Sequence, residues 1–180
     1  MEAAHKSRLI RWIIIAAVIL IADQATKLMA VDQLKGQDEI SYLGGTVRLI
    51  YAENTGAWGS LGEDWPQPWK TIVMTIVPLL VLTWIGVRMV RDATLPAIEG
   101  MAYALIISGG VGNIIDRLRL GYVVDFMWMG LKPPLTTNIF NIADLAIVGA
   151  IVLLVVEAIR AHREKKKQVA TVPKAEEGSV

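Results

Sequence analysis

Four long apolar stretches divide the chain, and polar segments separate them. We predict membrane-spanning helices over residues 10–30, 71–87, 97–115 and 139–159, because a helix needs about 20 predominantly apolar residues to cross a bilayer. Pro78 falls within the second span, where neighbouring groups can satisfy the carbonyl that it leaves free. A cleaved signal peptide would also begin with basic residues and an apolar run, but the first stretch lacks a clean small-residue cleavage site.

The segment between the first two spans is polar, and part of it has the composition of a β-strand. β-Branched and aromatic residues at 46–51 predict a strand, and residues 53–57 predict a turn that follows it. We expect a small sheet, within about residues 40–60, that lies on the membrane surface. The predicted fold is therefore an α-helical integral membrane protein, with four transmembrane helices and a small extracytoplasmic β-sheet.

Composition and charge agree with a membrane protein and predict its orientation. The chain is 54% hydrophobic with a mean hydropathy of +0.47, more apolar than an ordinary soluble domain. Basic residues gather at the N-terminus, in the 88–92 loop and in the tail, so the positive-inside rule places these parts in the cytoplasm. Segments 31–70 and 116–138 then face outward. We assign residues 1–160 to one membrane domain and expect residues 161–180, which are charged and nearly without apolar side chains, to be a disordered cytoplasmic tail.

The residue types narrow the chemistry to carboxylates. The chain has no cysteine, which excludes disulfides and thiolate metal sites, and its two histidines, His5 and His162, lie in charged terminal segments. A histidine zinc site or a Ser-His-Asp triad is therefore not expected. Glycines 109, 110 and 112 are not a phosphate loop, because no Gly-Lys-Ser/Thr follows them. We predict no metal, no cofactor and no nucleic-acid partner.

Residues 108–144 hold the most informative carboxylates. Asp125 and Asp144 lie within or beside apolar sequence, where a carboxylate is costly unless it is paired, hydrogen-bonded or protonated. We predict that these two aspartates face each other near one membrane surface and together activate a water molecule. Two close carboxylates cannot both ionise easily, so such a pair shares one proton. Asn141, at the start of the fourth span, is also a candidate helix N-cap.

Other polar residues are predicted at a similar depth in the membrane to Asp125 and Asp144. Asp23 and Lys27 are four residues apart on one helix face. They form either a self-neutralising pair at the membrane surface or part of a polar site into which Asp23 points. Asn113 shares a helix face with Asp116 and Arg117, and we expect Asp116 and Arg117 to form an ion pair with a structural role.

Taken together, these segments resemble lipoprotein signal peptidase (signal peptidase II), a family of bacterial intramembrane aspartyl proteases. Five motifs occur in the family's order between about residues 8 and 160: Asp23-Gln24-Ala25-Thr26-Lys27, Asn54-Thr55-Gly56-Ala57, Gly109-Gly110-Val111-Gly112-Asn113-Ile114-Ile115-Asp116-Arg117, Val123-Val124-Asp125-Phe126 and Phe140-Asn141-Ile142-Ala143-Asp144. The resemblance implies cleavage of prolipoproteins just before a diacylglyceryl-modified cysteine, without a metal, and it assigns catalysis to Asp125 and Asp144. It implies substrate-binding or supporting roles for Asp23, Lys27, Asn54, Gly56, Asn113, Asp116, Arg117, Asn141 and Ala143. The chain departs from the family at Trp58-Gly59, where Ala-Phe is common, which concerns the shape of the substrate-facing loop.

The implied partners are a lipid-modified prolipoprotein and membrane lipids, and we expect a monomer in the bacterial cytoplasmic membrane, with both termini in the cytoplasm. A substrate whose acyl chains stay in the bilayer can arrive laterally, and the loop at 54–58 can close over it. Two alternatives remain. A proton- or cation-coupled carrier would place its acids near the bilayer midplane, usually between repeats. A non-catalytic scaffold would tolerate Asp-to-Asn changes at residues 125 and 144.

Overall fold

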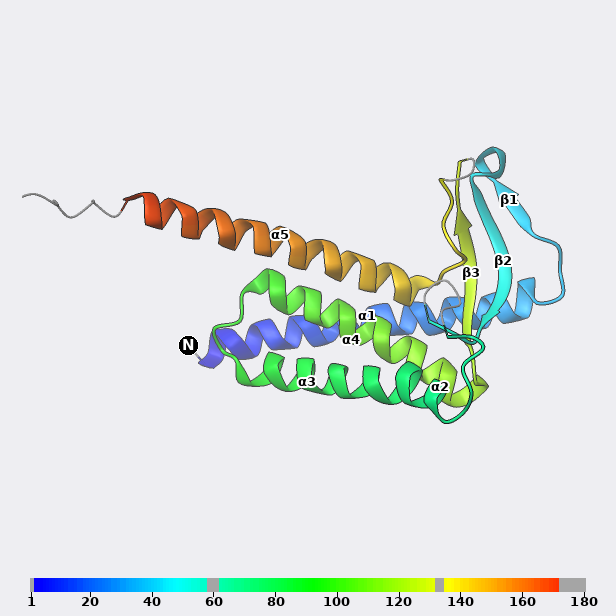
Figure 1. The fold of residues 1–180 in the computed structure, drawn as a ribbon, viewed down its shortest axis with the longest axis horizontal. Coiled ribbons are helices and arrows are strands. Elements are labelled where there is room, and N and C mark those ends of the chain that lie inside the picture. The colour runs from blue at the N-terminus through cyan, green and yellow to red at the C-terminus, as the bar shows by residue number, and fades with distance from the viewer. Residues whose placement is uncertain (1, 58–61, 132–134, 172–180) are drawn as a thin grey trace, which may run out of the picture.

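Four long helices lie side by side, and a small sheet crosses one end of them (Figure 1). The computed structural model describes residues 2–57, 62–131 and 135–171. The first, third and fourth long helices are α1 (Glu2–Leu34), α4 (Ala97–Leu120) and α5 (Ile142–Thr171). The second is continuous from residue 69 to residue 91 and consists of α2 (Trp69–Thr71), the π-helical η3 (Ile72–Ile76) and α3 (Val77–Arg91). The predicted fold class is confirmed.

Helix α4 occupies the centre of the bundle, since it packs against α1, α3 and α5. The helices extend beyond the predicted spans at most of their ends, because hydropathy detects only the apolar part of a helix. The fourth begins later than predicted, at residue 142 rather than 139. Residues 139 and 140 belong instead to a segment whose Phe140 pairs with Met127 of the sheet.

The expectation of disorder from residue 161 onward was wrong for residues 161–171, which continue α5 as a helix. Arg163 and Glu164 are exposed there, and both residue types have good helix propensity, so the helix extends without an apolar face to bury. The rest of the predicted tail, residues 172–180, lies outside the described residues.

The second long helix accommodates Pro78 through a wider turn. Proline has no N–H to donate to the carbonyl four residues earlier, which belongs to Met74. The turn that contains Met74 is the π-helical segment η3, where hydrogen bonds reach one residue further along the chain. The helix therefore continues through the proline to Arg91.

The sheet has three antiparallel strands in the order β1 (Ile40–Tyr42), β2 (Val47–Asn54) and β3 (Val123–Met129). The short 3-10 helix η1 (Leu43–Gly45) joins β1 to β2. β2 covers the predicted strand except for Thr46, which lies in the turn before it, and continues to Asn54, through residues that we expected in a turn. β3 was not predicted as a strand, since it lies in the segment that we treated as a connection between spans.

The sheet is fixed to α1 by an apolar cluster. Val124 and Phe126 of β3 pack with Ala30 and Leu34 in the last turns of α1. A second cluster, around Trp12, lies toward the opposite end of the bundle. The polar residues described below lie between these two clusters along α1.

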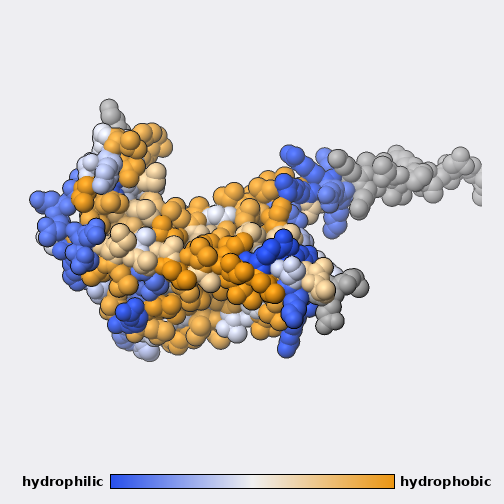
Figure 2. All heavy atoms as spheres, turned by 180° about the vertical axis from the view of Figure 1, so that it is seen from behind, coloured by the Kyte–Doolittle hydropathy of each residue, from blue (hydrophilic) through white to orange (hydrophobic). Residues whose placement is uncertain are grey.

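The outward helix faces carry large apolar side chains, as expected for contact with lipid. Ile21 is 68% exposed, Leu80 63% and Trp84 60%. Figure 2 shows a broad apolar band along the visible face of the bundle, with hydrophilic residues gathered at its two ends. All four long helices are long and apolar enough to cross a membrane, so the chain is a multi-pass membrane protein.

The end of the bundle away from the sheet holds the start of α1, the α3–α4 loop and the far end of α5 (Figure 1). Arg8 fastens α1 to that loop, because its guanidinium donates to the carbonyls of Ala93, at 2.8 Å, and Leu95, at 3.1 Å. Both ends of the described chain therefore lie on the side opposite to the sheet.

Candidate active site

Two aspartates meet at the sheet end of the bundle. Asp125 lies in β3 and is 2% exposed, and Asp144 lies in the first turn of α5. Asn141 contacts both: its side-chain amide donates to Asp125 Oδ1 at 2.7 Å, and its backbone N–H donates to Asp144 Oδ2 at 3.1 Å. The structure therefore brings the two carboxylates to one buried asparagine.

Asn141 is also the N-cap of α5. Its Oδ1 accepts the backbone N–H of Asp144 at 3.0 Å, while Asp144 Oδ2 accepts the backbone N–H of Asn141. This reciprocal arrangement is a capping box, which satisfies N–H groups that a helix start leaves free. The capping role that we considered for Asn141 is therefore present together with its contact to Asp125.

The other carboxylate oxygen of Asp125 is held from β2. Asn54 Nδ2 donates to Asp125 Oδ2 at 3.0 Å, and Asn54 Oδ1 accepts the backbone N–H of Gly56 at 3.0 Å. Burial raises the pKa of Asp125 to about 6, and the nearby Asp144 adds to the rise, whereas the hydrogen bonds from Asn54 and Asn141 oppose it. Asp125 thus retains its proton to a higher pH than an ordinary aspartate.

Asn113 of α4 joins the acids to a cation. Its Nδ2 donates to Asp144 Oδ1 at 3.0 Å. Its Oδ1 accepts hydrogen bonds from Asn141 Nδ2, at 3.1 Å, and from the ammonium of Lys27, at 2.9 Å. One amide therefore orients Asp144, Asn141 and Lys27 relative to one another.

Lys27 of α1 lies between two further carboxylates. Its Nζ is 2.9 Å from Asp23 Oδ2 and 3.0 Å from Asp116 Oδ2, and all three side chains are buried. Gln24 Nε2 donates to the same two carboxylates, at 3.1 Å each. The two accounts that we considered for Asp23 are thus compatible, because the pair neutralises itself and also lies inside the polar site.

The same two carboxylates fix the backbone beside the central aspartates. Asp23 Oδ1 accepts the N–H of Ala143 at 2.9 Å, which ties α1 to the first turn of α5. Asp116 Oδ2 accepts the N–H of Val124 at 3.1 Å, which ties α4 to β3. Ala143 and Val124 are the immediate neighbours of the two aspartates that meet at Asn141.

The predicted ion pair between Asp116 and Arg117 was wrong. Adjacent residues on a helix point about 100° apart, so their side chains diverge. Asp116 pairs with Lys27, while Arg117 turns toward the β2 side and donates to the carbonyl of Gly56 at 2.6 Å. Arg117 Nε is buried and has no hydrogen-bond partner among the described residues.

The charges divide into two groups. Asp23 and Asp116 share the ammonium of Lys27, whereas neither Asp125 nor Asp144 forms an ion pair within residues 2–57, 62–131 and 135–171. Their partners are neutral amide donors. Two close carboxylates without a cation of their own are suited to holding one proton between them. Within the same ranges, no group of three or more His, Cys, Asp or Glu side chains could hold a metal ion.

All the residues singled out in the sequence lie in this network, directly or through a backbone group. Gln24 was missed as a site residue, although it lies inside the first motif, between Asp23 and Lys27. The departure at Trp58-Gly59 lies outside the described residues.

Residues 15–160 match the family described as Signal peptidase (SPase) II. The chain belongs to the signal peptidase II family. It is therefore a peptidase embedded in a membrane, and the resemblance noted in the sequence is confirmed.

Curated relatives match most of the length of this signal peptidase II chain. The lipoprotein signal peptidase of Clostridium acetobutylicum is 32% identical over 158 residues, which make up 87% of this chain and 99% of the relative. That of Parasynechococcus marenigrum is 37% identical over 143 residues, 79% of this chain and 85% of the relative. The lipoprotein signal peptidase of Geobacter metallireducens is 35% identical over 159 residues, which make up 86% of this chain and 93% of the relative.

Two solved bacterial membrane enzymes, both determined by the in meso method, share the fold of this signal peptidase II. One has a TM-score of 0.72 at 23% identity and covers 94% of each chain. The other has a TM-score of 0.69 at 26% identity and covers 82% of this chain and 92% of its own. The helix bundle with a terminal sheet is thus an architecture of membrane enzymes.

Proposed function

We propose that this signal peptidase II is an aspartyl endopeptidase that cleaves diacylglyceryl-modified prolipoproteins immediately before the lipidated cysteine. Asp125 and Asp144 form its catalytic pair. The observation that carries the proposal is their arrangement around Asn141: both lack an ion-pair partner among the described residues, while the other two site aspartates share Lys27. The name of the curated relatives supports a lipoprotein precursor as substrate.

The pair acts through one shared proton. Asp125, whose pKa burial raises to about 6, carries the proton and donates a hydrogen bond to the scissile carbonyl oxygen. Asp144 lies at the N-terminus of α5, where the helix dipole interacts favourably with a negative charge, and it removes a proton from water. The water oxygen then bonds to the carbonyl carbon, which becomes tetrahedral, and the carbonyl oxygen takes the proton of Asp125.

The second step returns the pair to its starting state. The proton on Asp144 passes to the leaving amine nitrogen, and the carbon–nitrogen bond breaks. The carbonyl forms again as a carboxylic acid group, and the proton that Asp125 lent to the oxygen returns to it. One water is consumed, and no covalent bond joins substrate to enzyme.

The surroundings also fit a lipid-bearing substrate. Acyl chains can remain in the bilayer against the apolar helix faces while the peptide reaches the sheet end laterally. The loop at residues 54–57 then covers the peptide, and Arg117 holds this loop through Gly56. We further propose that the chain acts as a monomer in the bacterial cytoplasmic membrane, with both termini in the cytoplasm.

Cleavage of a purified, diacylglyceryl-modified precursor tests the proposal. Asp125→Asn and Asp144→Asn should each reduce kcat/KM by about a thousandfold or more, because neither variant can share a proton between two carboxylates. Asp32→Asn is the matched control, since Asp32 is exposed on α1, and it should cleave at the wild-type rate. Substantial turnover by either site variant would disprove the catalytic pair. Equal cleavage of the unmodified precursor would disprove the proposed substrate class.

A further inference from the structure

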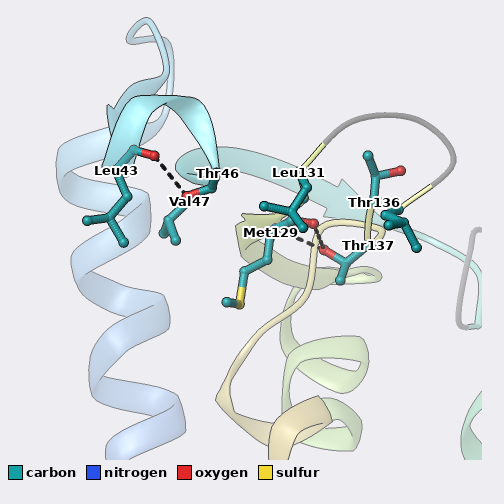
Figure 3. A pocket seen from close by; sticks show the side chains of 9 residues that line it. Leu43, Thr46, Val47, Met129, Leu131, Thr136 and Thr137 are labelled. Atoms are coloured by element: carbon teal, nitrogen blue, oxygen red, sulfur yellow. Dashed lines mark hydrogen bonds between the residues drawn. The ribbon is translucent and has the colours of Figure 1, made fainter.

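An apolar groove lies at the far tip of the sheet, away from the two aspartates (Figure 3). It has a volume of about 620 Å³ and is formed by η1, the start of β2, the end of β3 and residues 135–137. Nothing in the described residues fills it. We call this region the sheet tip, defined by residues 43–47, 129–131 and 135–137.

Two of the three threonines that line the groove direct their hydroxyls to the backbone. Thr46 Oγ1 donates to the carbonyl of Leu43 at 2.9 Å. Thr137 Oγ1 donates to the carbonyl of Met129 at 2.9 Å and accepts the N–H of the same residue at 2.9 Å. The hydroxyls of Thr46 and Thr137 are therefore engaged with the backbone (Figure 3). Leucine, valine and methionine side chains make up most of the rest of the lining, so the groove is mainly apolar.

The rim carries three large, exposed apolar side chains. Leu43 is 77% exposed, Leu131 71% and Leu135 68%. An exposed apolar cluster of this kind usually marks a surface that contacts another protein, a ligand or a membrane. Leu43 also has a positive φ of 51°, which is uncommon for a bulky residue and which glycine would adopt at lower cost.

Two residues of the groove share a face of the sheet with Asp125. Residues 125, 127 and 129 of β3 alternate onto one face, and Asp125 on that face contacts Asn141 at the start of α5. Met129 and its partner Val47, both of which line the groove, therefore lie on the same face as Asp125, the face that meets the start of α5.

The position of the tip identifies what it faces. Figure 1 shows the η1 end of the sheet projecting sideways past α5. This end of the sheet therefore lies outside the bundle, over the medium that surrounds the helices. Figure 2 shows apolar atoms on the bundle side of the tip and hydrophilic atoms on its opposite side. The lipid-facing apolar surface of the helices therefore lies beneath the apolar side of the tip.

We propose that the sheet tip dips into the membrane leaflet nearest the sheet and that its groove holds phospholipid acyl chains. The three leucines enter the boundary between headgroups and chains, as apolar faces of interfacial segments do. This contact keeps β3, and with it Asp125, at a constant depth relative to the lipid. The proposal depends on the four spans and not on the catalytic pair.

The absence of cysteine allows a direct measurement of depth. Single nitroxide labels at Leu43→Cys and Leu131→Cys are placed in nanodiscs of phosphatidylcholine and phosphatidylglycerol, with one protein per disc and no precursor. Collision with oxygen, which concentrates in acyl chains, is compared with collision with a water-soluble nickel chelate. Leu80→Cys, on the exposed face of α3, is the lipid control, and Asp38→Cys, in the exposed loop before β1, is the water control.

We expect both tip labels to favour oxygen several-fold over nickel, as Leu80→Cys does, while Asp38→Cys favours nickel. Tip labels that match Asp38→Cys would overturn the proposal. Protection that appears only when precursor is added would assign the groove to the peptide, and protection that requires two proteins per disc would assign it to a second copy. Either result also overturns lipid as the occupant, and none of these outcomes bears on the catalytic pair.

Discussion

At the residue scale, the site depends on amide side chains more than on charged ones. Asn54, Asn113 and Asn141 supply the side-chain donors that reach the two central carboxylates. A neutral donor orients a carboxylate without contributing the full charge that would fix it in the ionised form. The network therefore holds Asp125 and Asp144 in place, and in the proposed mechanism it leaves a proton free to move between them.

The pH dependence of cleavage should reveal this proton. Asp125 must be protonated in the proposed mechanism, and its pKa is about 6, so kcat/KM should fall about tenfold per pH unit above the upper pKa of the pair. Asn54→Ala removes a donor that favours the ionised carboxylate, which raises this pKa and moves the alkaline limb to higher pH. A pH–rate profile of both proteins checks the shift. A limb that stays in place, or moves to lower pH, would contradict the assignment to Asp125.

Lys27 should be far more important for stability than other cations at this end. Its replacement by methionine leaves Asp23 and Asp116 buried without a counter-charge, which should reduce the free energy of unfolding by about 3–5 kcal/mol. Lys35→Met is the matched control, because the Lys35–Glu53 pair is exposed and should contribute little. Thermal unfolding in detergent micelles measures the stability of both variants. Equal decreases in unfolding temperature would show that burial of the Lys27 cluster does not determine its contribution to stability.

At the element scale, the site requires helices that approach closely. A Cβ on Gly112 of α4 would lie 2.5 Å from Asp23 Oδ2, and Asp23 cannot withdraw without breaking its bonds to Lys27 and Ala143. Gly109 has a similar role, since a Cβ there would collide with the carbonyl of Ala143. These glycines let α1 and α5 meet α4 at the depth of the acids.

We therefore expect Gly112→Ala to destabilise the protein by about 1–3 kcal/mol and to reduce cleavage sharply, because Asp23 is displaced. Gly86→Ala in α3 is the control, since nothing lies within 4 Å of a Cβ at that residue and alanine has the better helix propensity. Unfolding temperature and cleavage rate should both separate the two variants. A harmless Gly112→Ala would mean that α1 and α4 can move apart without affecting the site.

The same elements explain what the sequence could and could not predict. Hydropathy located the four helices, because lipid contact leaves an uninterrupted apolar signal. It did not locate β3 (Val123–Met129). This apolar segment is too short to stand out in hydropathy, and we predicted no turn beside it. The meeting of Asp125 with Asp144 depends on that strand and on the start of α5, so no local spacing could establish it. The partner of Arg117 was predicted wrongly because Arg117 is adjacent to Asp116 in sequence, whereas helix geometry points the two side chains apart.

At the scale of the whole molecule, three zones follow one another along the bundle. The cluster around Trp12 joins α1, α3 and α4 at one end, and the cluster around Ala30 and Phe126 joins α1 to the sheet at the other. The Asp23–Lys27 pair lies between them, about 16 Å along α1 from Trp12. The polar residues are thus enclosed between two apolar layers, near the end of the membrane span that the proposed lipid-bearing peptide would reach.

Orientation in the membrane decides which compartment this end faces. The start of α1, the α3–α4 loop and the far end of α5 share one side and carry most of the clustered basic residues, so we predict that this side is cytoplasmic and that the sheet is outside. Single cysteines at Asp38, beside the sheet, and at Arg163, beyond the fourth span, allow a test with a membrane-impermeant maleimide. In intact spheroplasts Asp38→Cys should react, while Arg163→Cys should react only after the membrane is permeabilised. The reverse pattern would place the catalytic end in the cytoplasm, where a secreted precursor could not meet it after crossing the membrane.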